Sequence, residues 1–266
     1  GELVADTGNK LGGRGVSVGL TTQDEVSQAY SVAISEEEEV VVERCLAGDD
    51  YRLLVVGEEL IAAARRCAPC ITGDGISTIE TLVQKENRNP RRCDDHAGSL
   101  SLLCLDAAAE VALREQGFSK ESIPNDGQLV LLRRNANLST GGTAEDVTDL
   151  VHPDTIRLAI DAVRVVGLDI AGVDIMATRI DQPLSIQHGG VVEINACPGL
   201  RMHLEPTVGE SRDVGSAIID TLFETGDDGR VPVAAVTGTN GKTTVTRLLA
   251  HVASTGGATV GIACTE

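Results

Sequence analysis

Apolar and polar residues alternate along the chain in a way that predicts strands and helices in mixed order. Two runs rich in β-branched residues, 40–43 and 52–56, are separated by a GlyAspAsp turn and predict adjacent strands. Longer apolar runs at 169–176 and 191–195 predict two more strands. Residues 155–166 repeat apolar side chains with a helical period, which predicts an amphipathic helix. Together these patterns predict an α/β fold.

The opening of the chain predicts two strands joined by a glycine-rich turn and followed by a helix. The turn, residues 6–15, has the composition of a loop that covers phosphate groups. Thr22 followed by Glu25 is a capping-box pattern, so a helix is expected to begin there and to end near Ile34. With the runs that follow, this order predicts a βαββ opening.

The middle of the chain is less periodic. Residues 66–98 combine Pro, Gly, Asn and clustered Arg, so we expect an irregular segment around a short helix at 76–86. A longer helix is expected over 99–116. Ser211 is expected to cap a further helix whose buried side holds apolar residues.

A polar, turn-rich stretch at 226–230 predicts a domain boundary. The first domain then spans 1–226 and the second spans 227–266. The second domain begins with an apolar strand, a glycine turn, a helix over 242–254 and another strand. Because the chain begins with Gly1 in a predicted strand and stops straight after another, we expect both domains to be truncated.

Composition agrees with a globular protein and restricts its partners. The chain of 266 residues is 42% hydrophobic, which suffices for a sizeable core. Its net charge of −18 and pI near 4.6 argue against broad binding to nucleic acid or to an acidic membrane, because both are polyanions. The sequence has no long apolar run and no signal-peptide pattern. A cytoplasmic location is therefore expected, and an odd count of seven cysteines fits reduced thiols.

The sequence ThrGlyThrAsnGlyLysThrThr at 237–244 predicts a phosphate-binding loop, because it lies between an apolar strand and an amphipathic helix. Its glycines allow backbone amides to approach phosphate oxygens, the helix N-terminus attracts anions, and a lysine adds a cation. The alternative is an ordinary strand-to-helix turn. The nucleotide-binding candidates are Gly238, Thr239, Asn240, Gly241, Lys242, Thr243 and Thr244, and Thr243 is also a candidate magnesium ligand.

A second candidate site combines Asp174 with Glu193 and Asn195. Residues two apart on a strand point to the same face, so the carboxylate of Glu193 and the amide of Asn195 can address one ligand. Oxygen donors of this kind suit Mg²⁺. The alternative is a strand-end carboxylate that faces water.

Two further stretches carry clustered charges. Glu43, Asp50 and Arg52 flank a turn, with more arginines at 64–66, and a carboxylate at such a hinge can accept from ribose hydroxyls. The loop 133–143 brings arginines, amides and glycines together and can bind carboxylate or phosphate. Ordinary strand-end charges and a plain polar loop are the alternatives.

Taken in order, these motifs resemble the cyanophycin synthetase family over nearly the whole chain. Residues 1–225 resemble part of its ATP-grasp domain, and 231–266 resemble the start of its Mur-ligase-like domain. The resemblance implies ATP and Mg²⁺ as cofactors. The implied magnesium ligands are Asp174, Glu193 and Asn195; the implied adenosine contacts are Glu43 and Asp50; and the implied catalytic residues are Arg134, Asn137 and Arg201, the last facing the carboxylate of the growing chain.

The resemblance implies a ligase that makes the Asp-Arg polymer cyanophycin through acyl phosphates. The ATP-grasp site would add aspartate to the backbone, and the Mur-like site would attach arginine to the aspartate side chain. The implied partners are aspartate, arginine and a polypeptide primer, with no nucleic acid and no membrane, in a homo-oligomer. Alternatives are another ATP-grasp carboxylate–amine ligase, glutamate-adding or glutathione-forming, and a degenerate nucleotide-binding remnant.

One departure from the family pattern concerns phosphate neutralisation. Related ATP-grasp chains carry a lysine just before the glycine-rich loop, where this sequence has Val4, Ala5 and Asp6. Either Lys10 compensates or the first site is impaired. We also expect the 266 residues alone to lack ligase activity.

Overall fold

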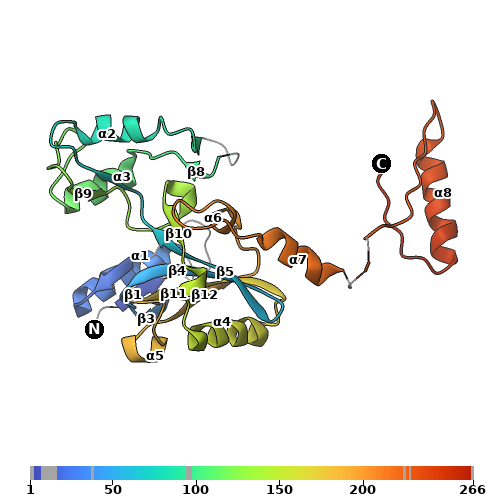
Figure 1. The fold of residues 1–266 in the computed structure, drawn as a ribbon, viewed down its shortest axis with the longest axis horizontal. Coiled ribbons are helices and arrows are strands. Elements are labelled where there is room, and N and C mark those ends of the chain that lie inside the picture. The colour runs from blue at the N-terminus through green and yellow to red at the C-terminus, as the bar shows by residue number, and fades with distance from the viewer. Residues whose placement is uncertain are drawn as a thin grey trace. The chain divides into compact units, whose positions relative to one another are not determined.

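A five-stranded antiparallel sheet lies at the centre of the first unit of the chain (Figure 1). The computed structural model describes residues 3–6, 17–36, 39–93, 98–223, 226–227 and 229–264. They divide into two units, Gly1–Leu222 and Phe223–Glu266. In spatial order the strands of the central sheet are β10 (Thr143–Asp146), β5 (Glu59–Cys67), β4 (Asp49–Val56), β11 (Ile170–Ala177) and β12 (Gly190–Asn195).

One face of the central sheet packs against helix α4 (Pro153–Val166). Alternate residues of β4, such as Leu53 and Val55, are fully buried in this core with Val163 of the helix. The helix begins after His152, whose Nδ1 accepts from a backbone amide at 3.1 Å, and it ends at Gly167 with φ 80°. The amphipathic helix expected from the sequence is therefore present and supplies the main core.

The opposite face is only partly covered by apolar residues. Helix α7 (Val214–Leu222) packs Val214 against Leu54 and Val56 at one end of the sheet. The short helix α6 (Arg201–Leu204) places Met202 against small side chains of β5 and β10. The rest of this face carries charged residues, which form the site described below.

The N-terminus of α7 differs from the sequence-based expectation. Asp213, not Ser211, caps it: the amide of Ser216 donates to Asp213 Oδ1 at 3.1 Å and its hydroxyl donates to Oδ2 at 2.8 Å. Because the helix begins at Val214, Ser211 lies too far upstream to reach the first-turn amides.

A small sheet of β2 (Ser17–Leu20), β1 (Leu3–Asp6) and β3 (Val41–Arg44) precedes the central sheet, together with helix α1 (Gln23–Glu36). The capping box of α1 is present, since the Glu25 amide donates to Thr22 Oγ1 at 3.2 Å and the Thr22 amide donates to Glu25 Oε2 at 3.0 Å. Most of the glycine-rich turn, including Lys10, lies outside the described residues.

The prediction that the runs 40–43 and 52–56 form adjacent strands is wrong. β3 pairs with β1 in the small sheet, whereas β4 pairs with β5 and β11 in the central one. Gly48 lies between them with φ 125°, and a Cβ there would come within 2.3 Å of the Ala177 backbone. Glycine allows the backbone to pass this close to Ala177. The segment therefore joins the small sheet to the central sheet and does not join two neighbouring strands.

Helices α2 and α3 form a separate lobe with a two-stranded sheet, and their core includes Ile79, Leu113 and Val130. The prediction of a helix over 99–116 is only partly right. Asp106 accepts from the Ala109 amide and starts the helix at Ala107, while the residues before it are extended. The remaining elements of this unit are α2 (Ile79–Glu86), α3 (Ala107–Glu115), α5 (Leu184–Gln187), β6 (Cys70–Thr72) paired with β9 (Leu129–Leu131), β7 (Arg92–Cys93) paired with β8 (Leu100–Ser101), and the 3₁₀ helices η1 (Leu138–Thr140) and η2 (Thr148–Leu150).

The second unit contains helix α8 (Lys242–Thr255). The two strands expected on either side of it are not formed among the described residues of this unit, because neither flanking segment has a strand to pair with. Across the described part of the whole chain, no helix is long and apolar enough to cross a membrane.

Candidate functional site

The candidate site is the charged part of the central sheet, on the face opposite α4. Residues directly opposite each other on antiparallel strands point to the same face. Asp174 of β11 lies opposite Arg52 of β4 on one side and opposite Glu193 of β12 on the other. Asn195 is two residues beyond Glu193 and shares its face. The three predicted magnesium ligands therefore project from two neighbouring strands toward the same side.

Asp174 is held between two arginines. Arg52 forms a bidentate pair with it, through Nε to Oδ1 and through Nη2 to Oδ2 at 2.8 Å. Arg66 of β5 donates from Nη2 to the same Oδ2 at 2.9 Å. All three side chains are about nine-tenths buried. A buried carboxylate with two guanidinium partners is fixed in position.

Asp50 extends this network along β4. It accepts from Arg66 Nε at 3.0 Å and from Arg66 Nη2 at 2.6 Å and 2.8 Å. Burial lowers the pKa of Arg66, but the carboxylates of Asp174 and Asp50 outweigh it and raise that pKa above its ordinary value. Burial raises the pKa of Asp50, and the Arg66 charge opposes this rise. The result is an Asp50–Arg66–Asp174–Arg52 chain of alternating charges.

Gly172 provides space for this network. It lies two residues before Asp174 in a central strand, where a glycine is otherwise unfavourable. A Cβ at this position would lie 2.8 Å from Arg52 Cδ and 2.8 Å from Pro198 Cβ. The missing side chain therefore lets the Arg52 side chain and the 198 loop approach the sheet together.

His203 of α6 lies beneath the same face and is 2% exposed. Neither ring nitrogen has a hydrogen-bond partner among the described residues. Burial lowers its pKa to about 4, and the nearby Arg52 charge contributes. His203 is therefore neutral at physiological pH and adds no charge to the network.

The predicted adenosine contacts are placed on different sheets. Glu43 is exposed on β3, opposite Val4 of the small sheet. Asp50 is at the start of β4 with both oxygens bonded to Arg66. The segment between β3 and β4 joins the two sheets, and the two carboxylates lie on the strands before and after it. Their contact with adenosine stays a prediction.

The predicted catalytic residues do not form one cluster. Arg134 is exposed and pairs with Glu115 at 2.8 Å. The backbone oxygen of Asn137 accepts from the amides of Thr140 and Gly142, each at 3.1 Å. Arg201 donates to Gly98 O at 3.1 Å and to Ser101 Oγ at 3.3 Å, and no carboxylate pairs with it in the described part of the chain.

Of the three predicted catalytic residues, Arg201 lines a pocket. Leu138, the neighbour of Asn137, lines a pocket of about 310 Å³ with residues 199–202, among them Arg201. Because no carboxylate among the described residues pairs with it, the Arg201 guanidinium beside this pocket can hold a substrate carboxylate. Arg134 is not among the lining residues.

The predicted phosphate loop in the second unit forms a turn before α8. Gly238 and Gly241 have φ values of 146° and 76°, which residues other than glycine rarely adopt. Lys242 Nζ donates to Gly238 O at 2.8 Å and to Thr239 O at 3.4 Å. The ammonium group thus lies over its own loop, at the N-terminus of a 14-residue helix where anions are favoured.

The first unit is similar in sequence and in structure to known proteins. A RimK-like ATP-grasp domain matches residues 125–221. The crystal structure of a bifunctional glutathione synthetase from Pasteurella multocida is similar to 83% of this chain, with 32% sequence identity and a TM-score of 0.62. The matched part is 31% of the length of that synthetase. Residues 125–221 of the first unit therefore have the fold of an ATP-grasp domain. The α/β fold expected from the sequence is confirmed.

The relatives of this chain include cyanophycin synthetases. That of Synechocystis sp. is 43% identical over 256 residues, 96% of this chain, and that of Geminocystis herdmanii is equally similar. The predicted resemblance is therefore confirmed. The chain spans 29% of the length of each. A glutathione biosynthesis bifunctional protein from Clostridium perfringens is 34% identical over 79% of the chain.

The residues of the charged sheet face fit a magnesium ion in part. Glu193 is exposed and Asn195 is half-buried, with its Nδ2 atom buried and without a partner among the described residues. A carboxylate accepts about four hydrogen bonds, and Asp174 accepts three from the two arginines. One direction on its Oδ1 therefore remains. The described residues hold no group of three or more His, Cys, Asp and Glu that could bind a metal, so the set is two carboxylates and an amide.

Arg52 and Arg66 belong to a stretch that the sequence marks only as clustered charge, and His203 belongs to no predicted site, although the structure places all three at this face. Arg52 is two residues from Asp50, so the two side chains share a face on β4, but the sequence predicts a turn at Asp50 and a strand only from residue 52. No comparable signal identifies His203, since its burial depends on how α6 packs.

Proposed function

We propose that this chain belongs to an ATP-dependent carboxylate–amine ligase that makes the Asp-Arg polymer cyanophycin. The proposal depends chiefly on one observation: Asp174, Glu193 and Asn195 share a sheet face with two buried arginines. Such a face offers anionic oxygens and guanidinium groups side by side, as a nucleotide with bound magnesium requires. The similarity to cyanophycin synthetases over 96% of the chain supports the choice of polymer.

The reaction proceeds in two steps. The acceptor carboxylate attacks the γ-phosphorus of ATP, forming an acyl phosphate while ADP leaves. The amine of the incoming amino acid, after losing a proton, attacks the acyl carbon, and inorganic phosphate leaves. Positioning and charge stabilisation supply the catalysis, so the protein needs no covalent nucleophile.

The buried arginines have a defined part in these steps. Nη1 of Arg52 and Nη1 of Arg66 have no hydrogen-bond partner among the described residues, so they can donate to phosphate oxygens. Asp174 holds both guanidinium groups in place. Glu193 and Asn195, with the free direction on Asp174, would hold Mg²⁺, which neutralises phosphate charge when bound. Arg201 would orient the acceptor carboxylate at the 199–202 pocket.

The second unit would supply the other ATP site of the same polymer. In this proposal Lys242 leaves its two loop carbonyls and donates to nucleotide phosphate, while Thr243 contacts magnesium. That site would attach arginine to the aspartate side chain. The short glycine turn and the long helix after it support phosphate binding.

Titration of the 266-residue chain with Mg²⁺ and a non-hydrolysable ATP analogue tests the two sites separately. Glu193→Gln with Asn195→Ala is expected to weaken one binding event at least about tenfold, because each change removes a magnesium ligand. Lys242→Ala is expected to weaken only the other. Glu210→Gln, an exposed carboxylate outside both sites, is the matched control. If neither the double variant nor Lys242→Ala alters binding, the site assignment is wrong.

Polymer synthesis is measured on the complete gene product supplied with ATP, Mg²⁺, aspartate, arginine and a short primer. Release of ADP together with an Asp-Arg polymer is the expected result. A second candidate function is glutathione formation, favoured by the 34% identity to the Clostridium protein. It predicts ADP release with glutathione precursors and none with aspartate, arginine and primer. A degenerate remnant would bind nucleotide at neither site.

A further inference from the structure

Two adjacent arginines, Arg91 and Arg92, contact the segments that follow the two walls of the 199–202 pocket. The sequence marks them only as clustered charge in an irregular segment, and no step of the proposed reaction uses them. The pocket is formed by Leu138 of η1 and by residues 199–202, which are distant in the sequence. The relative position of its walls therefore depends on contacts with other parts of the chain, and this arginine pair supplies such contacts.

Arg92 fixes the wall that contains Leu138. Its side chain is 4% exposed. Nη1 donates to Gly141 O, directly after η1, at 3.3 Å and to Ser101 O of β8 at 2.7 Å. Nε and Nη2 both donate to Glu86 Oε1 of α2, each at 3.3 Å. Arg92 therefore joins the end of η1 to β8 and to α2.

Arg91 fixes the other wall, which leads into α6. Its Nη2 donates to Pro206 O at 2.9 Å and to Glu205 O at 3.4 Å, directly after that helix. Its Nε donates at 3.1 Å to the hydroxyl of Ser99, which is buried. Arg91 therefore joins the end of α6 to the residues just before β8.

Segment 98–101 connects the arginine pair to Arg201. Arg201 Nη1 donates to Gly98 O at 3.1 Å and its Nη2 donates to Ser101 Oγ at 3.3 Å. The same four-residue segment accepts from both members of the pair. A displacement of this segment would move the two oxygens that orient the Arg201 guanidinium. The pair thus holds both pocket walls and the support of the arginine between them.

We infer that Arg91 and Arg92 are positioning residues, which hold the walls of the 199–202 pocket and orient Arg201 within it. The consequence for acceptor binding rests on the proposed function, in which Arg201 orients the acceptor carboxylate. A guanidinium group suits this task because its planar fork of donors bonds to several acceptors at once. A lysine ammonium on a flexible stem keeps the charge without that geometry.

Initial rates of ADP release by the complete gene product test the role of the pair. Primer and aspartate are supplied and arginine is left out, so that only the first site turns over. Arg91→Met is expected to raise KM for the primer at least about fivefold and to leave KM for ATP within about twofold. Arg91→Lys recovers part of this loss, and Arg92→Lys acts in the same direction as Arg91→Met. Arg88→Met, which changes an exposed arginine of the same segment, is the matched control and leaves both constants within about twofold.

A double-mutant cycle shows whether Arg91 acts through Arg201. Arg201→Gln alone is expected to raise KM for the primer at least about tenfold, because the acceptor carboxylate loses its guanidinium partner. Adding Arg91→Met then changes that constant by less than about twofold, since no guanidinium remains to be oriented. Effects that multiply as for independent residues would overturn the inference.

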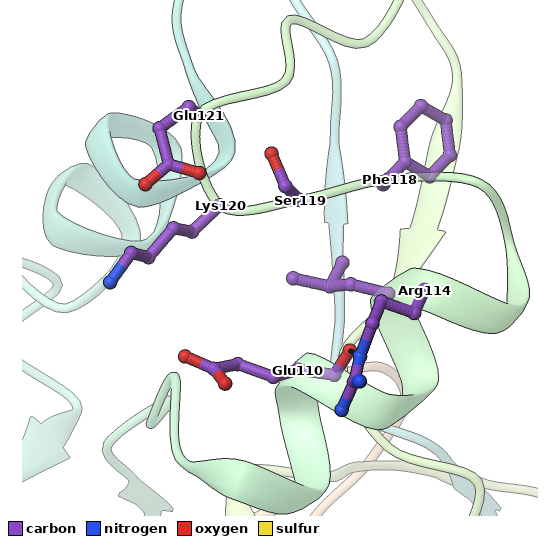
Figure 2. Close-up of a pocket in the computed structure, with 7 residues that line it drawn as sticks. Glu110, Arg114, Phe118, Ser119, Lys120 and Glu121 are labelled. Atoms are coloured by element: carbon purple, nitrogen blue, oxygen red, sulfur yellow. Dashed lines mark hydrogen bonds between the residues drawn. The ribbon is translucent and has the colours of Figure 1, made fainter.

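Hydrogen exchange followed by mass spectrometry tests the pocket walls without any turnover. Arg91→Met is expected to accelerate exchange at least about threefold in peptides that cover 201–206, and Arg92→Lys in those that cover 138–142. The internal reference is a smaller pocket of about 140 Å³, formed by α3 and the turn after it, with Glu110 and Phe118 among its lining residues (Figure 2). Neither member of the pair forms a hydrogen bond with a residue that lines it, so its exchange stays unchanged.

The two measurements separate this inference from the ligase proposal. Unchanged exchange at both walls, or equal acceleration in the reference pocket, would refute the positioning role. Local acceleration with an unchanged KM for the primer would refute the effect on acceptor binding and leave the ligase proposal intact. Absence of ADP release from the parent protein would refute the ligase proposal, and exchange would still decide whether the pair holds the walls.

Discussion

Acid is expected to weaken the fold through His203, whose imidazole is buried without a hydrogen-bond partner among the described residues. Its pKa is about 4 in the folded chain, against 6.5 for a free histidine. Between these two values the unfolded chain binds a proton that the folded chain does not, so stability is lost as the pH falls from 6.5 to 4. Each pKa unit corresponds to about 1.4 kcal/mol, and the full loss is therefore about 3 kcal/mol.

Comparison with His203→Leu isolates this contribution. At neutral pH the leucine variant is expected to be as stable as the parent or about 1 kcal/mol more stable, because two unsatisfied buried nitrogens are removed. The advantage of the variant then grows by about 3 kcal/mol down to pH 4. Urea unfolding, followed by circular dichroism at half-unit pH steps, measures the difference between the two proteins.

The control is His251→Gln, which removes an exposed histidine. Its difference from the parent is expected to be independent of pH. A constant difference between the parent and His203→Leu across the same range would refute the reasoning, since it would mean that His203 titrates alike in the folded and unfolded chains. Other titrating groups are common to the two proteins and cancel in this comparison.

The remaining predictions concern the charged face and the ends of helices. Arg66→Met is expected to destabilise the chain by about 3–5 kcal/mol, because it leaves Asp50 without its ion-pair partner and removes one of the two arginines that bond to Asp174; chemical denaturation measures the loss, and a change below about 1 kcal/mol would contradict the network. Gly172→Ala is expected to cost about 1–3 kcal/mol in the same assay, because its Cβ would lie 2.8 Å from each of two side-chain carbons. Asp213→Ala is expected to lower the melting temperature while Ser211→Ala leaves it unchanged, and the opposite order would restore Ser211 as the cap of α7.

Local patterns were sufficient for several parts of the structure. The capping box of Thr22 and Glu25 and the helical period of α4 depend on residues within a few positions of one another. The shared face of Glu193 and Asn195 follows in the same way from the two-residue repeat of a strand. The turn predicted at GlyAspAsp is present only at Gly48, because Asp49 and Asp50 already belong to β4, and the partner strands were not visible in the sequence.

Partners distant in the sequence required the tertiary structure. Asp174 and Arg52 are 122 positions apart, and their pairing follows from β4 and β11 being neighbours in the sheet. Likewise, the strands expected around α8 did not form, because a strand needs a hydrogen-bonded neighbour that the helix cannot supply.

The sequence by itself determined the fold class, the motif order and which residues share a strand face, because these depend on short-range periodicity and on similarity to relatives. Only the tertiary structure decided that two arginines enclose Asp174, that Arg134 instead pairs with Glu115, and that His203 is buried. Burial and ion pairing arise from contacts between distant segments, and no local pattern encodes which segments will meet.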